Sequence, residues 1–308
     1  MDADSAGHMA EDRTADGPAG PAAPERGAGG ERIAKLLARA GVGSRREVER
    51  MIAAGRVALA GERVTSPALK LADLSAVTVD GRPVPRPDPP RLWRLHKPRG
   101  VLVTRRDPEG RRTLADLLPA ELRALKPVGR LDINSEGLLL LTNDGELKRL
   151  LEHPESAIAR SYRVRVHGPL DEARLKPLRE GVVIAGERFR PMEIALERSG
   201  RSNHWLLVTL REGRNREIRR AFAAAGLQVD RLIRTRYGPL TLGSLAPGAI
   251  AEVPQKTLLA LLEALPGGED LRAALLAARS WSPERWARPK RPAGPRRTRR
   301  QRAKGRAR

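Results

Sequence analysis

The sequence has no cysteine, and aromatic residues make up only 3% of its 308 positions. Without cysteine the chain forms no disulfide bond, thiolate metal site or thiol nucleophile, which fits a reducing cytoplasm. It also lacks an apolar run of the roughly eighteen residues that a membrane-spanning helix needs. No basic start followed by an apolar segment opens the chain, so we expect no secretory signal, no membrane partner and a cytoplasmic location.

A second group of absences narrows the chemistry. No glycine-rich loop ends in Lys-Ser or Lys-Thr, which disfavours an NTPase. The histidines are spaced too widely to suggest a metal site. They stand at positions 8, 96, 153, 167 and 204. We therefore expect neither a metal nor a small-molecule cofactor.

Basic residues are in large excess. Lysine and arginine number 59 against 37 aspartates and glutamates, which gives a net charge of +22 and a pI of about 11.4. An excess of this size indicates a polyanionic partner, either nucleic acid or an anionic membrane surface. Half of it lies in residues 287–308, which hold eleven basic residues and no acidic one. We expect this tail to be disordered and to bind phosphates without regard to sequence.

The composition divides the chain into two folded parts between two tails. Five prolines fall between residues 83 and 90 and indicate a stiff linker. Within the C-terminal tail, residues 271–278 favour a helix. We expect a disordered N-terminal tail at 1–30, a small domain at 31–82, the proline-rich linker at 83–91, a larger domain at 92–265, and a basic, largely disordered tail at 266–308.

The small domain carries the signals of two short helices and a small sheet. Ile33, Leu36 and Leu37 share one helical face. Ser44-Arg45-Arg46-Glu47 matches the capping box that starts a second helix, and hairpin patterns follow at 57–64 and 77–81. Arginines near this helix start are placed to meet phosphates. The expected RNA-binding residues here are Arg45, Arg46, Arg50 and Arg56.

The larger domain alternates strand and helix patterns. Strands are expected at 92–95, 101–104, 138–141, 162–167, 182–184, 192–196, 205–210 and 227–233, and helices at 114–117, 146–151, 171–180, 216–225 and 255–265. Short turns such as Ala185-Gly186-Glu187 favour antiparallel pairing over parallel crossover units. We therefore expect an α+β fold in which helices flank a mixed, mainly antiparallel sheet.

Residues 128–147 organise this larger domain. They read V-G-R-L-D-I-N-S-E-G-L-L-L-L-T-N-D-G-E-L. The four leucines before the turn signal predict a strand buried on both faces, which gives a rigid base for the preceding loop. Asp132 lies in that loop, two residues after Arg130. A loop aspartate is most often a turn former or a helix cap, but one held near an arginine stays ionised and is available as a nucleophile.

A second segment of interest is 212–220, E-G-R-N-R-E-I-R-R. It follows an apolar strand and opens a helix whose buried side includes Ile218 and Phe222. One interpretation is a solvated basic helix start that clamps phosphate. The other is that one of its arginines turns inward and pairs with a carboxylate.

A third segment, 160–166, reads R-S-Y-R-V-R-V. Its arginines alternate with Tyr162 and two valines, as expected for a half-buried strand. Tyr162 is then either a core residue or an aromatic plate for a flipped base.

Taken in order, these motifs resemble the RsuA/RluB family of ribosomal-RNA pseudouridine synthases. The resemblance rests on Gly129-Arg130-Leu131-Asp132, the S-E-G-L-L-L-L-T-N-D-G-E-L run, the R-S-Y-R-V strand and the G-R-N-R-E-I-R-R segment. The His96-Lys97-Pro98-Arg99-Gly100 turn is similar to the Lys-Pro-x-Gly segment of that family. Residues 31–82 resemble its small alpha-L, S-four-like RNA-binding domain. The resemblance is nearest to the RluB, large-subunit branch.

The resemblance implies a role for individual residues. Asp132 matches the catalytic aspartate, and Tyr162 matches the tyrosine that stacks on the target base and helps to remove its carbon-5 proton. Arg219 matches the arginine that pairs with the aspartate, and Ile218 matches an apolar residue of the pocket.

We expect further residues around this set to complete the pocket and to bind RNA. The additional pocket residues are Arg130 and Leu131. The additional RNA-binding residues are Lys97, Arg160, Arg214, Arg216 and Arg220. Arg160 stands where family members often carry lysine, which keeps the charge.

The implied activity is the isomerisation of a specific uridine in ribosomal RNA, with large-subunit RNA favoured, to pseudouridine. Nothing is oxidised and no group enters from outside, so the reaction requires no cofactor. A single carboxylate either attacks the sugar carbon or removes a neighbouring sugar proton, and the residues leave both routes open. We expect a monomer whose partner is ribosomal RNA or an assembling ribosomal subunit.

Two other functions fit parts of the sequence. A non-catalytic RNA-binding factor in ribosome assembly would share the composition, but it would not need Asp132, Tyr162 and Arg219 together. A glycoside hydrolase would pair Asp132 with Glu136 or Asp144. Sugar clefts usually need aromatic platforms, which this chain largely lacks.

Overall fold

A computed structural model describes residues 30–278 of the chain. Most of the two tails expected at 1–30 and 266–308, including the basic segment 287–308, lies outside the described residues. The chain separates into two compact units, and the division between Asp88 and Pro89 falls inside the proline-rich segment. No helix of the described part is both long and apolar enough to cross a membrane.

The N-terminal unit contains two helices and two small sheets. Its helices are α1 (Ile33–Arg39) and α2 (Arg45–Ala53), and its strands are β1 (Glu31–Arg32), β2 (Val57–Leu59), β3 (Glu62–Arg63), β4 (Lys70–Leu71), β5 (Val77–Val79) and β6 (Arg82–Pro83). The expected capping box is confirmed: Glu47 Oε2 accepts from the Ser44 backbone N–H at 2.7 Å, and Ser44 Oγ accepts from the Glu47 N–H at 3.3 Å. Apolar residues of both helices, among them Ile33 and Ile52, form a separate core.

The larger unit is built on a nine-stranded sheet whose main path runs β13-β14-β10-β15-β9-β7-β17. The strands are β7 (Leu92–Lys97), β8 (Lys126–Val128), β9 (Glu136–Thr142), β10 (Arg160–His167), β13 (Glu193–Ser199), β14 (Asn203–Leu210), β15 (Gln228–Tyr237), β16 (Leu240–Thr241) and β17 (Ile250–Glu252), with β11 (Val182–Ile184) and β12 (Glu187–Phe189) in a separate hairpin. Every strand pair of the large sheet is antiparallel except β15 with β9. The expected mixed, mainly antiparallel sheet is confirmed.

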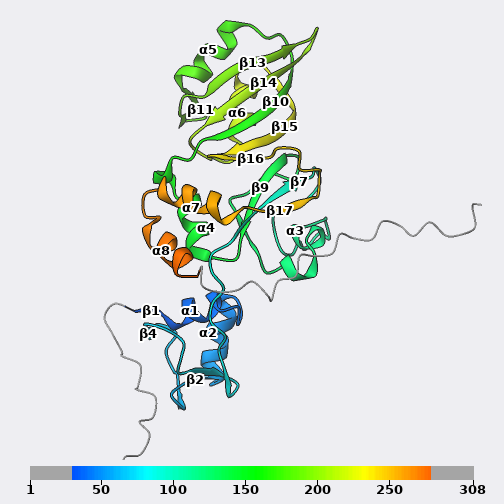
Figure 1. The fold of residues 1–308 in the computed structure, drawn as a ribbon. Helices are drawn as coiled ribbons and strands as arrows, with labels where there is room; N and C mark the ends of the chain where they lie inside the picture. The colour runs from blue at the N-terminus through cyan, green and yellow to red at the C-terminus, as the bar shows by residue number, and fades with distance from the viewer. Residues whose placement is uncertain (1–29, 279–308) are drawn as a thin grey trace, which may run out of the picture. The chain divides into compact units, whose positions relative to one another are not determined.

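Helices cover this sheet and enclose two apolar cores. They are α3 (Leu114–Leu117), α4 (Gly145–Glu152), α5 (Glu172–Glu180), α6 (Glu217–Ala224), α7 (Gln255–Glu263) and α8 (Glu269–Ala277), with short 3-10 turns at Ala120–Leu122 and Pro154–Ser156. Helices α5 and α6 contribute to one core, which includes Tyr162 and Phe222. Helices α4, α7 and α8 contribute to the other, and Figure 1 shows them gathered beside the β9 part of the sheet.

Strand β9 separates the two cores. Leu139 and Leu141 face the core of α5 and α6, whereas Leu138 and Leu140 face the core of α4 and α7. All four side chains are fully buried. The prediction of a strand buried on both faces is therefore confirmed.

The structure differs from the expected elements in three places. Residues 101–104 form no strand and contribute only an isolated bridge from Leu102 to Thr113, because the chain leaves the sheet at the turn through Gly100. Lys126–Val128 forms an unexpected strand, and its proline is tolerated because the strand pairs along one side only, with β9. The helix expected at 271–278 forms as α8 and buries Leu271 and Leu275 against the core, so the folded part continues past residue 265 into the segment expected to be largely disordered.

A short parallel contact joins the two parts of the large sheet. Strand β9 meets β15 only through Glu136 opposite Ile233 and Gly137 opposite Arg234. Gly137 has φ +101°, and a Cβ atom there would lie 2.3 Å from the backbone oxygen of Arg234. The buried Arg234 side chain crosses the same contact, and its Nε donates to the Leu138 oxygen at 2.7 Å.

We predict that Gly137→Ala destabilises the protein, because the new methyl group meets backbone atoms in a conformation that L-residues rarely adopt. The loss in the free energy of unfolding should be about 2–3 kcal/mol, measured by urea denaturation. Gly186→Ala is the control, since Gly186 also has positive φ but meets no atom within 4 Å. Equal losses in the two variants would contradict the close approach at Gly137.

Candidate active site

A cleft of about 1240 Å³ opens in the larger unit. One side is the loop between β8 and β9, which carries Asp132, and the other includes β10 with Tyr162 and the start of α6 with Ile218. Three segments far apart in the sequence thus meet in one cavity. Of the other expected residues, the cleft is also lined by Arg130, Leu131, Arg160, Arg214 and Arg216.

The Asp132 loop is held by its own backbone and by its neighbours. Gly129 begins it with φ +65°, and the side chain of Leu131 turns into the core. The Ser135 N–H donates to the backbone carbonyl oxygen of Asp132 at 3.0 Å, and the Gly100 N–H donates to the backbone carbonyl oxygen of Ile133 at 2.8 Å. Asp132 itself is partly exposed, so its carboxylate can face a substrate in the cleft.

The buried side chain of Lys97 holds this loop through hydrogen bonds to its backbone. Its side chain is 0% exposed, and Nζ donates to the oxygens of Ser135 at 2.8 Å and Pro98 at 3.1 Å. Burial lowers the pKa of Lys97 to about 8, although the nearby charges of Asp132 and Glu136 act in the opposite direction. The expectation that Lys97 binds RNA is wrong, because its position on the inward face of β7 directs the ammonium group to loop carbonyls.

Arg216 is the arginine that reaches the aspartate. Its Nη1 lies 3.5 Å from Asp132 Oδ2, and both side chains are partly exposed. Arg219 instead donates to the oxygens of Val229 at 2.7 Å and Asn134 at 3.2 Å. The expected Arg219–Asp132 pair is therefore wrong for this structure, because half-burial one turn into α6 leads the Arg219 guanidinium to backbone carbonyls.

Arg219 still lies within the electrostatic reach of Asp132. Burial and the neighbouring Arg216 lower the pKa of Arg219, while Asp132 acts to raise it. Arg219 lines a separate hollow of about 410 Å³ together with Arg216. Its hydrogen bond to Asn134 ties the start of α6 to the Asp132 loop.

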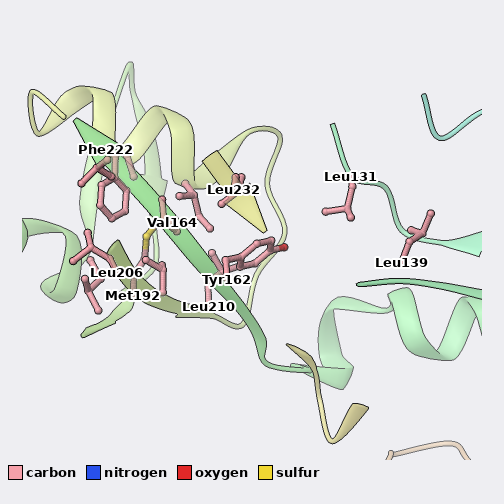
Figure 2. Close-up of a cluster of buried hydrophobic side chains, with 14 of the residues drawn as sticks. Leu131, Leu139, Tyr162, Val164, Met192, Leu206, Leu210, Phe222 and Leu232 are labelled. Atoms are coloured by element: carbon pink, nitrogen blue, oxygen red, sulfur yellow. The ribbon is translucent and has the colours of Figure 1, made fainter. Parts of the chain in front are cut away.

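Tyr162 is a core residue that also lines the cleft, so its place in the structure is compatible with both interpretations. Its side chain is only 8% exposed and belongs to the core under α6, together with Ile218. It also lines the cleft. Figure 2 shows its hydroxyl pointing away from Phe222, toward the side on which Leu131 lies. The ring is thus a packed wall of the cleft.

Several arginines expected to bind RNA are engaged by protein groups. Arg214 pairs with Glu187 at 2.6 Å and with Glu212 at 3.0 Å, and Arg220 pairs with Glu187 at 2.7 Å. Arg160 stacks on the Tyr237 ring, with its guanidinium carbon 4.9 Å from the ring centre. A guanidinium that contacts a carboxylate or a ring has fewer donors left for RNA, and RNA binding by these arginines stays a prediction.

The arginines of the N-terminal unit divide in the same way. Arg56 binds Asp80 through two hydrogen bonds of 2.8 and 2.5 Å, so its charge is compensated. Arg45, Arg46 and Arg50 are exposed on α2. In the cleft, Arg130 is likewise exposed. These four side chains remain suited to phosphate contact.

The sequence interpretation overlooked an acidic pair at the start of α6. Glu217 is only 4% exposed, and burial together with the adjacent Glu212 raises its pKa to about 8. Its Oε2 accepts from the Arg214 N–H at 3.0 Å, and Glu212 accepts from the Arg190 N–H at 2.6 Å. The pair fastens the loop before α6. Its only sequence signal is two acids within a basic segment.

The acids proposed for a glycoside hydrolase do not assemble with Asp132. Glu136 forms two 2.9 Å hydrogen bonds with Arg231, which hold the pKa of Glu136 below its usual value and keep it ionised. Asp144 is buried, and neither acid lines the cleft. Within residues 30–278, no cluster of three or more histidine, aspartate or glutamate residues could hold a metal ion.

Comparisons with known proteins identify the family to which the chain is similar. Residues 91–224 match the family model described as RNA pseudouridylate synthase, and residues 31–75 match the S4 domain. An uncharacterized RNA pseudouridine synthase of Rickettsia prowazekii is 43% identical over 227 residues, covering 74% of this chain and 96% of the relative. The ribosomal large subunit pseudouridine synthase B of Salmonella typhi is 44% identical over 225 residues, covering 69% and 75%. A solved structure titled as that of a pseudouridylate synthase aligns with a TM-score of 0.52 and 26% identity, over 74% of this chain and 97% of that one.

We predict that Lys97 makes stability depend on pH. Its pKa is about 8 in the folded chain and near 10.5 when unfolded, so between these values the unfolded state binds more protons and the free energy of unfolding rises with pH. Lys97→Met removes this contribution. From about pH 7.5 to about pH 9.5, the free energy of unfolding of the wild type should therefore rise by about 1–2 kcal/mol relative to that of the variant. Urea denaturation at both pH values measures it, and a constant difference would contradict the buried ammonium.

Proposed function

Because the chain belongs to the RNA pseudouridine synthase family, we propose that it converts a specific uridine of ribosomal RNA, in the large subunit, to pseudouridine. The observation that carries this proposal is the meeting of Asp132, Tyr162 and Ile218 in one cleft. The choice of large-subunit RNA is supported by the names of relatives such as the ribosomal large subunit pseudouridine synthase B of Salmonella typhi. We propose that the chain acts as a monomer on RNA or on an assembling subunit.

The reaction requires one bond to break and one to form at the same sugar carbon. The bond from the ribose to base nitrogen 1 breaks, the uracil turns, and carbon 5 joins the ribose. The proton on carbon 5 then leaves and nitrogen 1, freed from the ribose, gains a proton, so atoms and electrons balance without a cofactor. Asp132 either attacks the sugar carbon directly or removes a proton from the neighbouring sugar carbon.

The detached uracil must stay in the cleft, because water would otherwise complete a hydrolysis. Leu131, Tyr162 and Ile218 are buried, and all three line this cleft. They form apolar walls beside Asp132. The Tyr162 ring offers a face on which the uracil can stack as it turns.

The target base must first leave its stack, at a cost of a few kcal/mol. Phosphate contacts from exposed arginines, such as Arg130 in the cleft and Arg45 on α2, offset this cost. The basic segment 287–308 would add contacts that do not depend on sequence. Binding should therefore weaken steeply as salt is added.

We predict that the protein releases tritium from RNA labelled at uridine carbon 5, and that Asp132→Asn releases none. The amide keeps the shape of the side chain but cannot attack or take the sugar proton. Large- and small-subunit transcripts are tested separately. Asp107→Asn is the matched control, since Asp107 also pairs with an arginine, Arg111, and does not line the cleft.

Each outcome has a defined meaning. Release by Asp132→Asn would remove Asp132 from its role, and release from the small-subunit transcript alone would reverse the choice of subunit. No release by the wild type, from transcripts or partly assembled particles that it binds tightly, would favour a non-catalytic assembly factor.

We predict that removing residues 287–308 weakens RNA binding and reduces its salt dependence while turnover at saturating RNA stays intact. The reason is that each phosphate neutralised by a basic residue releases counterions. Filter binding across a salt series measures the slope. A loss of saturated turnover in the shortened protein would show that the segment contributes to the reaction itself.

A further inference from the structure

The loop that carries Asp132 begins with a hydrogen bond to a side chain from a distant helix. The Gly129 N–H donates to Glu152 Oε1 at 2.5 Å. Gly129 follows the last residue of β8, and its φ of +65° turns the chain toward Asp132. Both Gly129 and Glu152 line the cleft. The hydrogen bond to the end of α4 therefore fixes the direction in which the chain enters the Asp132 loop.

Helix α4 holds Glu152 in a fixed place. Its residues Leu147 and Leu151 are fully buried in the core that also contains α7 and α8. Glu152 is the last residue of this helix. The carboxylate thus sits on a packed element rather than on a mobile loop, which is what a positioning group requires.

Helix stability does not account for a glutamate at this position. A negative charge at the C-terminal end of a helix lies beside unpaired carbonyl groups and is unfavourable. Glu152 also pairs with Lys148 one turn earlier, and a lysine placed before the glutamate is the weaker order for such a pair. The hydrogen bond from Gly129 gives a reason for a carboxylate here that the stability of α4 does not.

Lys148 removes the obvious objection to a carboxylate in a cleft that receives RNA. The Lys148 ammonium pairs with the same oxygen, Oε1, that accepts from Gly129. Lys148 also lines the cleft. The pair therefore adds no net negative charge to the wall, and phosphates are not repelled.

We propose that Glu152 is a positioning residue that fixes the start of the Asp132 loop. Lys97 fixes the other end through Ser135, so the catalytic aspartate lies between two clamps. Loss of one clamp leaves Asp132 in place on average but less well aimed. The effect on catalysis rests on the proposed function, whereas the effect on the loop does not.

The kinetic test compares Glu152→Ala with Glu152→Gln under saturating, single-turnover conditions. The alanine variant should lose about tenfold in rate with little change in RNA affinity, because small misplacements of a reacting group are costly. The glutamine variant keeps an oxygen acceptor for Gly129 and should recover to within about threefold of wild type. Glu180→Ala is the control, since Glu180 forms the same kind of pair with Lys176 on α5, away from the cleft.

A second measurement does not depend on activity. Amide hydrogen exchange of the peptide that spans residues 129–132 should become faster in Glu152→Ala and stay slow in Glu152→Gln, with the rest of α4 unchanged. Unaltered exchange in the alanine variant, or equal rate losses in alanine and glutamine variants, would overturn the positioning role. Silence of the wild-type enzyme would overturn the proposed activity, and the exchange result would still decide the role of Glu152.

Discussion

The burial of strand β9 on both faces is the constraint on which the site depends. Its leucines face two separate cores, so the strand cannot shift by one residue without moving every side chain into the wrong core. The Asp132 loop is the direct N-terminal continuation of this strand. A reactive group on a loop acquires the precision of the core when the loop is short and clamped, and here Lys97 and Glu152 clamp it.

The sequence revealed those features whose causes are local. The capping box at Ser44, the alternation of β10 and the leucine run of β9 each depend on residues close in sequence, and each appears in the structure. The resemblance to a known family pointed to Asp132, Tyr162 and Ile218, and all three line the cleft.

Partner choice between distant residues was much harder to anticipate. Arg216 and Arg219 lie one turn apart at the start of α6, and only the depth of each side chain decides which one reaches Asp132. Lys97 carries the positive charge of a phosphate ligand, but the pleat of β7 turns its side chain inward. The acidic partners Glu187 and Glu152 come from elements that no local pattern connects with the cleft.

The strength of the contact to Asp132 fits its proposed chemistry. Glu136 shows the alternative, since two 2.9 Å bonds to Arg231 occupy both of its oxygens and keep it a structural anion. Asp132 meets Arg216 through one oxygen at 3.5 Å, and both groups are partly exposed. Such a loose pair leaves one carboxylate oxygen without a close arginine contact, and an incoming ribose can displace the arginine. The backbone clamps, rather than the ion pair, supply the orientation, so holding the group and activating it are separate tasks done by separate residues.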